Sequence, residues 1–155
     1  MAAQTGRTVS RWVTFNIDDS AGTPRSIAVN TINGVGLVYS ELDLTAWFDA
    51  IRGALPEQPD CVITIGGPFD TVATTGSHTV LSGIVGLNTP LTLDVQVGIR
   101  HAWESGEPQF GITSSSANGF LCRSYDVDLS SMQYTATFGM FPGSAAPAWG
   151  TTAES

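Results

Sequence analysis

The segment ELDLTAWFDAIRGAL, which begins at Glu41, is the one part of the sequence where apolar residues recur with a helical period for about three turns. The apolar positions in it are Leu44, Trp47, Phe48, Ile51 and Leu55. A stripe of this kind forms one face of a helix and has to be buried against a partner. Asp43 suits the N-cap, and Gly53 and Pro56 favour an end to the helix. The pattern therefore predicts an amphipathic α-helix from Asp43 to Leu55.

Most of the remaining chain has the pattern of strands separated by turn residues. The clearest strand, Leu91 to Ile99, alternates apolar residues with polar residues or glycine. A second, short helix is expected to begin at Ser77, to carry Val80, Leu81 and Ile84, and to end at Gly86. The expected strands are Ser10–Ile17, Ser26–Val29, Gly36–Ser40, Cys61–Ile65, Leu91–Ile99, Gly111–Ser116, Gly119–Val127 and Met132–Phe141. The predicted fold is mainly β, a two-sheet sandwich or barrel of about eight strands with the flanking α-helix from Asp43 to Leu55.

Both ends of the chain lack periodicity and are expected to be arms of a single domain. The predicted divisions are an N-terminal arm at 1–9, a β-domain at 10–141 and a C-terminal arm at 142–155. The C-terminal arm holds Trp149, and a large aromatic side chain on a terminus is expected to dock either on its own domain or on a neighbour. The loop from Arg100 to Phe110 is rich in turn residues and is a further candidate for interactions.

Charged residues are scarce and mostly acidic. Only 13% of the residues are charged, about half the usual share, and the formal net charge is −8. A surface with so few charges suits a protein that packs into an assembly. The acidic balance argues against adhesion to nucleic acid, which requires clustered basic residues. No apolar run is long enough to span a membrane, and the N-terminus lacks the pattern of a secretion signal.

The sequence contains no catalytic pattern, and no enzyme activity, cofactor or metal is expected. Cys61 and Cys122 lie in predicted strands and are expected to be reduced thiols in the core. His78 and His101 have no partners at the spacing of metal ligands, and His78 is expected to cap or pack. The pair of Glu104 and Glu107 has the composition of a glycosidase site, but on one loop a solvated or salt-bridged role is expected.

Several segments resemble structural proteins of tailed bacteriophages, in particular those similar to siphophage tail tube subunits. The resemblance follows the order RWVTFNID, ELDLTAWFDAIRGALP and GPFDTVATTGSHTVLSGIVG along the chain. It rests on the helix introduced by Asp43 to Thr45 and on the turn from Phe69 to Gly76. The closing PGSAAPAWGT, Pro142 to Thr151, also resembles phage virion proteins.

The resemblance implies a non-enzymatic virion protein, assembled in a bacterial host cytoplasm, that stacks as hexameric rings around a DNA channel. Within the virion, a capsid decoration or cement protein acting as a trimer is the alternative, and a carbohydrate-binding module is the alternative from another class. The expected partners are copies of the chain and other virion proteins, without sequence-specific nucleic-acid binding and without a membrane. The candidate assembly residues are Trp103, Glu104, Phe110 and Trp149, and the candidate lumen-facing acids are Asp94, Asp126 and Asp128.

Overall fold

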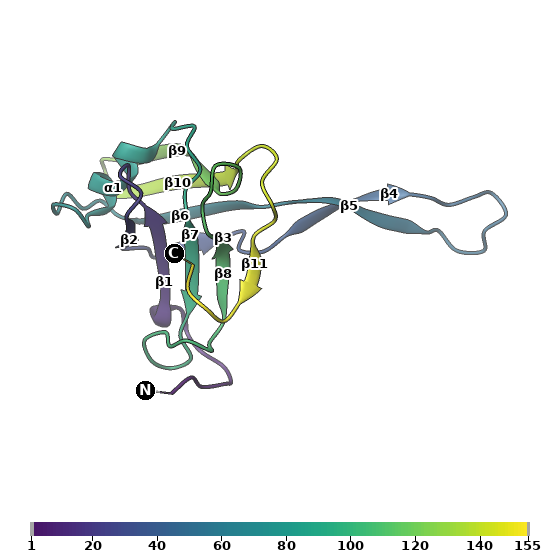
Figure 1. The fold of residues 1–155 in the computed structure, drawn as a ribbon, viewed down its shortest axis with the longest axis horizontal. Helices are drawn as coiled ribbons and strands as arrows, with labels where there is room; N and C mark the ends of the chain where they lie inside the picture. The colour runs from purple at the N-terminus through teal and green to yellow at the C-terminus, as the bar shows by residue number, and fades with distance from the viewer. Residues whose placement is uncertain (1, 155) are drawn as a thin grey trace.

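The computed structural model describes residues 2–154 and shows two β-sheets that enclose one hydrophobic core (Figure 1). The first sheet has the strand order β11-β8-β7-β1-β2, and each neighbouring pair is antiparallel. Its strands are β1 (Val13–Asp18), β2 (Pro24–Ile27), β7 (Leu93–Val97), β8 (Gln109–Ile112) and β11 (Ala148–Gly150). A 3₁₀ turn, Ser10–Trp12, leads into β1.

The second sheet has the order β3-β6-β10-β9 and is also antiparallel. Its strands are β3 (Thr31–Asn33), β6 (Val62–Pro68), β9 (Phe120–Asp128) and β10 (Gln133–Met140). Alternate side chains of the two sheets point into the space between them. The largest fully buried ones are Tyr134, Phe15, Phe110, Phe120 and Phe138. The rings of Phe15 and Phe138, one from each sheet, lie 5.5 Å apart between centroids, so the core joins both sheets.

The single helix, α1 (Ser77–Ile84), contacts β9 and β2 at one end of the sandwich. Val80, Leu81 and Ile84 are buried in the core, as the sequence predicts for this segment. The Ser77 hydroxyl donates a hydrogen bond to the carbonyl of Pro68 at 2.8 Å, so Ser77 ties the first turn to β6. The mainly β class with one flanking helix is confirmed, but the flanking helix is α1.

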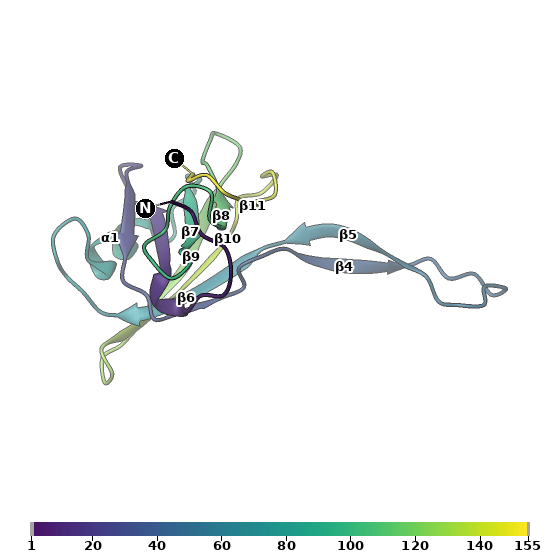
Figure 2. The same ribbon diagram turned by 90° about the horizontal axis from the view of Figure 1, so that it is seen from below.

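The predicted helix from Asp43 to Leu55 is wrong. This part of the chain is a long β-hairpin of β4 (Val38–Asp43) and β5 (Ala54–Asp60), joined by residues 44–53. The hairpin is a separate two-stranded sheet that projects far from the body (Figure 2). The residues PEQPD, which have the composition of a linker, lie in β5. Proline is tolerated there because both strands of a two-stranded ribbon are edges.

Candidate assembly interface

The hairpin exposes every residue of β4 and β5. At its tip Trp47 is fully exposed, Phe48 is 91% exposed and Ile51 is 82% exposed. The other exposed apolar side chains on the hairpin are Val38, Tyr39, Leu42, Leu44 and Leu55. So many exposed apolar side chains on one projecting hairpin are unusual on an isolated protein and are typical of a site of contact with another molecule.

Local hydrogen bonds keep the tip in an ordered turn although it has no core beneath it. The Asp43 carboxylate accepts hydrogen bonds from the Thr45 backbone N–H and from the Arg52 guanidinium, each at 2.9 Å. The pKa of Asp43 is lowered first by the Thr45 side chain, then by the Thr45 backbone N–H and then by the Arg52 guanidinium. The Asp49 carboxylate accepts from the Ala46 N–H at 2.8 Å, and the Thr45 hydroxyl accepts from the Gly53 N–H at 2.8 Å. The polar groups are thus paired within the turn while the aromatic side chains remain free.

A buried carboxylate ties the N-terminal arm to the loop before β8. Glu107 is fully buried, and its two oxygens accept hydrogen bonds from the backbone N–H groups of Gln4, Ile99 and Glu104. The His101 ring nitrogen Nε2 lies 3.0 Å from Glu107 Oε2. Burial opposes ionisation of Glu107, but these N–H groups and His101 outweigh it and hold the pKa of the carboxyl below its usual range.

Further bonds hold the same arm in place. The Thr8 hydroxyl donates to the Gly98 carbonyl at 2.6 Å, and the Arg100 guanidinium donates to the Thr5 carbonyl at 3.1 Å. Arg100 has a positive φ of 65°. The predicted arm at 1–9 is therefore, over its described residues, a largely exposed segment that hydrogen bonds hold to its own domain. The sequence predicts a solvated or salt-bridged Glu107, whereas the structure buries it completely, with its Oε2 3.0 Å from the His101 ring.

The C-terminal segment also packs on its own domain. Its strand β11 pairs with β8, which places Trp149 opposite Phe110 with ring centroids 5.1 Å apart. Trp149 remains 54% exposed, whereas Phe110 is completely buried. The structure thus brings these two candidate assembly residues together. The other two, Trp103 and Glu104, lie half-buried in the loop beside Glu107, where the Trp103 indole N–H faces the carbonyls of Glu107 and Pro108. Their role in assembly remains a prediction.

The three candidate lumen acids lie on different sheets. Asp126 and Asp128 are exposed on β9, at the edge of the second sheet. Asp94 is on β7 in the first sheet and is only 3% exposed, because the C-terminal segment lies near it. A lumen-facing role remains a prediction for all three, and for Asp94 it requires that the C-terminal segment move away.

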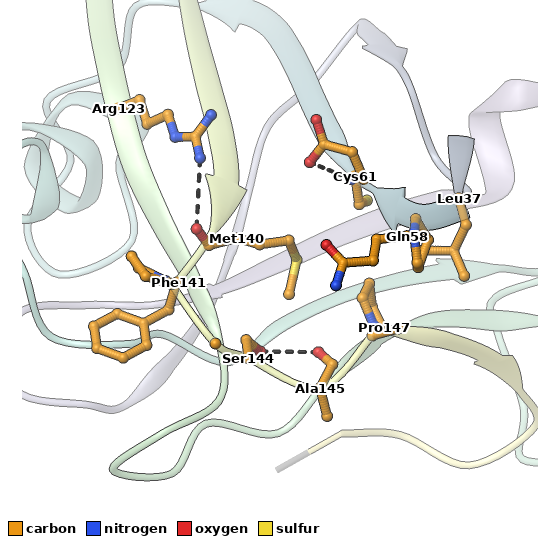
Figure 3. A pocket seen from close by; sticks show the side chains of 14 residues that line it. Leu37, Gln58, Cys61, Arg123, Met140, Phe141, Ser144, Ala145 and Pro147 are labelled. Atoms are coloured by element: carbon orange, nitrogen blue, oxygen red, sulfur yellow. Dashed lines mark hydrogen bonds between the residues drawn. The ribbon is translucent and has the colours of Figure 1, made fainter. Parts of the chain in front are cut away.

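A cavity of about 600 Å³ lies where the hairpin leaves the body, beside the C-terminal segment (Figure 3). Arg123 and Met140 line one side of it, and Leu37 and Gln58 line the other. Its thiol, Cys61, is buried, and burial raises the pKa of that group. The Ser144 hydroxyl donates to the adjacent Ala145 carbonyl at 2.9 Å. The cavity lining therefore shows no nucleophile activated by a base.

The cysteines and His78 have the surroundings of residues that pack in the fold. Cys61 and Cys122 are both buried and free, as predicted, and burial raises the pKa of Cys122 to about 11. His78 packs against Phe69, and its Nδ1 lies 3.0 Å from the Tyr125 hydroxyl, which agrees with the predicted packing role. Residues 2–154 contain no group of three potential metal ligands. Within the same residues, no helix is long and apolar enough to cross a membrane.

Comparison with known proteins gives similarity at the level of fold. No protein-family model matches the sequence, and no curated protein matches it. Among solved structures, a chain from the PVC sheath-tube complex of an extracellular contractile injection system superposes with a TM-score of 0.59 at 10% identity, covering 94% of this chain and 93% of that one. A chain of the PVC sheath/tube terminator gives 0.59 at 11% identity over 96% of this chain and 99% of that one.

Chains from a second particle give the same result. One from the anti-feeding prophage baseplate has a TM-score of 0.61 at 11% identity, covering 94% of this chain and 97% of its own length. One from the tube-terminating cap of that particle has 0.61 at 10% identity, covering 98% and 96%. The resemblance to phage-like tail proteins that the sequence suggests is therefore confirmed at the level of fold: the chain has, over nearly its whole length, the fold of proteins found in contractile injection particles.

Proposed function

We propose that the chain is a structural subunit of a phage-like tail and that it assembles with copies of itself into the tail tube. The fold supports a structural role, since the similar chains come from a sheath-tube complex, a terminator, a baseplate and a cap. The scarcity of charged residues, 13% of the chain, agrees with a surface that is largely covered in an assembly.

The projecting hairpin is the observation that carries the proposal. Its strands and its aromatic tip bury nothing within the chain. A two-stranded hairpin is marginally stable in water by itself. The tip residues Trp47, Phe48 and Ile51 gain their burial only when they contact another molecule, and a second copy of the chain is the partner available in a homo-oligomer.

The contact that follows is of the head-to-tail type. The surface that the hairpin presents differs from the surface of the body that receives it, so each copy donates one contact and accepts another. Contacts of this kind close into rings or extend as filaments. A tube of stacked rings, hexameric in our proposal, needs contacts that close each ring and contacts that extend the stack. The net charge of −8 suits a channel through which DNA slides, because like charges prevent adhesion.

The proposal is tested by the solution mass of the purified chain and by negative-stain microscopy over a range of protein concentrations. A tail tube subunit forms rings or tubes with a central hole wide enough for a DNA duplex. A chain that stays a monomer or trimer at every concentration and binds phage heads contradicts the tube and supports a capsid decoration protein. By the same proposal, the chain is part of the virion.

A further inference from the structure

The carboxyl group of Asp94 occupies an unusual position in the first sheet. The residue lies in the middle strand, β7, directly opposite Asn16 of β1 and Gly111 of β8. Its side chain points away from the hydrophobic core, yet only 3% of it is exposed. Oδ2 accepts a hydrogen bond from the Gln96 amide at 2.9 Å, whereas Oδ1 is buried and accepts no hydrogen bond of standard geometry from the described residues, although Gln109 and the Glu154 backbone lie near the carboxyl group. A buried carboxylate oxygen without a donor is costly when the group is ionised.

The C-terminal segment, residues 148–154, first extends the sheet at its edge as β11 and then brings Glu154 beside Gln109 and Asp94. Its strand β11 is three residues long, and all three residues are exposed. Beyond β11 the backbone N–H of Gly106 donates to the Thr151 carbonyl at 2.8 Å. The segment ends at Glu154, whose carboxylate accepts hydrogen bonds from the Gln109 amide at 3.4 Å and from the Thr113 hydroxyl. Few bonds hold the segment, so its detachment costs less than global unfolding.

The charged group that faces Asp94 has the same sign. The Gln109 amide, which lies near Asp94, donates to the Glu154 carboxylate of the C-terminal segment at 3.4 Å, and the other side chains toward Asp94 are the neutral Gln96 and Asn16. Burial raises the pKa of Asp94, and the Glu154 carboxylate adds to that rise. The polar groups of Gln109 and Gln96 and the backbone of Glu154 offset only part of it.

We propose that residues 148–154 form a pH-dependent strap, which lies closed on the sheet while Asp94 is protonated and detaches as Asp94 ionises opposite Glu154. A proton on Asp94 removes the buried charge and supplies a donor to the polar cluster around it. Loss of that proton leaves two carboxylates together with no cation beside them among residues 2–154, and detachment restores water to both.

The direction of the pH effect follows from the pKa of Asp94 in the two states. The pKa is higher when the strap is closed than when water reaches the carboxyl. The closed state is therefore fully favoured at pH values below the open-state pKa and loses stability as the pH rises through the closed-state pKa. Each unit of difference between the two pKa values changes the ratio of closed to open strap about tenfold.

Detachment has a structural consequence at the edge of the sheet. With the strap closed, β11 occupies the outer edge of β8 and Trp149 covers Phe110. With the strap open, the backbone groups of β8 become an unpaired edge, which can accept an extended segment of another molecule. The strap therefore acts as a cover for this edge, and the inference stands independently of the tail tube proposal.

The test is hydrogen exchange measured by mass spectrometry on the intact chain from about pH 4 to pH 8, with correction for the intrinsic pH dependence of exchange. We expect the protection of peptides covering residues 148–154 to fall as the pH rises, while peptides of β6 and β10 keep theirs. The Asp94→Asn variant removes the titrating group and is expected to retain protection across the whole range. Glu154→Gln removes the facing charge, which lowers the closed-state pKa of Asp94, and is expected to make the loss of protection smaller.

Two controls separate this strap from a general effect of pH. Asp126→Asn removes an exposed acid from the other sheet and is expected to leave the profile of the strap unchanged. The second control is Asp18→Asn, which alters another buried acid of the first sheet whose pKa is raised by burial and whose carboxylate accepts from the Thr92 N–H at 3.0 Å. It is also expected to leave the profile of the strap unchanged. A protection profile that does not change with pH in the wild type, or one that Asp94→Asn leaves unaltered, overturns the proposal.

Discussion

The sandwich body and the hairpin use similar apolar side chains in opposite ways. Phe138 is completely buried between the two sheets of the body, whereas Phe48 is 91% exposed at the hairpin tip. Burial of one such side chain contributes about 1.5–3 kcal/mol. The body obtains this stabilisation within the chain, but the tip obtains it only from a partner. By our proposal, stability and assembly are therefore controlled by separate parts of the molecule, and substitutions are expected to separate them.

The largest effect is expected in the body. Phe138→Ala removes a ring that packs 5.5 Å from Phe15 across the two sheets, and it leaves a cavity in the core. We expect the free energy of unfolding to fall by about 3–5 kcal/mol. Chemical denaturation followed by fluorescence measures the change. A loss below about 1 kcal/mol would show that the sheets do not share one tightly packed core.

Deletion of Gly143 to Ser155 tests whether the C-terminal segment belongs to the body or to the assembly. The deletion removes the Trp149 contact with Phe110, which contributes about 0.5–1.5 kcal/mol beyond the area it buries, and leaves the core between the sheets intact. We expect a folded domain that assembles poorly. Circular dichroism with thermal unfolding checks the fold, and sedimentation velocity checks assembly. A deletion variant that assembles like the wild type contradicts the prediction.

The N-terminal arm is expected to stay attached to the body at neutral pH and to be released in acid. Glu107 has its pKa lowered by the N–H groups that it binds, so its contribution is present above its ordinary pKa and is lost as the pH falls through the lowered value. Acid is therefore expected to release residues 2–9, the opposite direction to the C-terminal strap. Limited proteolysis as a function of pH detects the release. Glu107→Gln should weaken the attachment of the arm at neutral pH and remove its pH dependence. An arm that resists proteolysis equally in the wild type and the variant contradicts a role of Glu107 in holding it.

The smallest effect is expected at the hairpin turn. The ion pair between Arg52 and Asp43 is 2.9 Å long and largely exposed. Surface pairs of this kind contribute about 0.2–1 kcal/mol. Arg52→Ala should leave the unfolding of the body unchanged within about 0.5 kcal/mol. Thermal unfolding measures this, and a larger loss would mean that the hairpin and the body fold as one unit.

The sequence predicts the elements whose pattern and surroundings agree. The alternation in β7 and β10 and the apolar positions of α1 identify strands and helix correctly, because these segments bury one face within the chain. The strand boundaries shift by a few residues. Gln109 begins β8, for example, whereas the expected strand begins at Gly111.

The sequence pattern predicts a helix where the structure has the hairpin, and the reason is physical. The spacing of Leu44, Trp47 and Phe48 predicts a helix only if a partner surface covers the stripe, and no such surface exists within the described chain. Asp43 uses its carboxylate at the start of a turn, which resembles an N-cap in sequence but leads into no helix. Local hydrogen bonds and pairing with β5 therefore outweigh helical periodicity.

The buried carboxyls could not be predicted from local sequence. Asp94 is placed correctly on the polar face of its strand, but the segment that covers this face lies some 60 residues later. Glu107 lies in a segment with the composition of an exposed loop. Its burial involves a hydrogen bond from the backbone N–H of Gln4, 103 residues earlier in the chain. Both depend on contacts between segments distant in sequence, which periodicity does not reveal.

The central claim is that the hairpin tip drives self-assembly, and the most direct measurement is the assembly of a Trp47→Ser/Phe48→Ser double variant. Light scattering and microscopy across protein concentration give the threshold at which rings or tubes appear, and chemical denaturation gives the stability of the body. Leu129→Ser, which alters a 73% exposed side chain on the turn between β9 and β10, is the matched control. The account predicts that the double variant retains its free energy of unfolding within about 0.5 kcal/mol. It also predicts that the threshold concentration for assembly rises at least about tenfold in the double variant and is unchanged in the control. A double variant that assembles at the wild-type concentration contradicts the account.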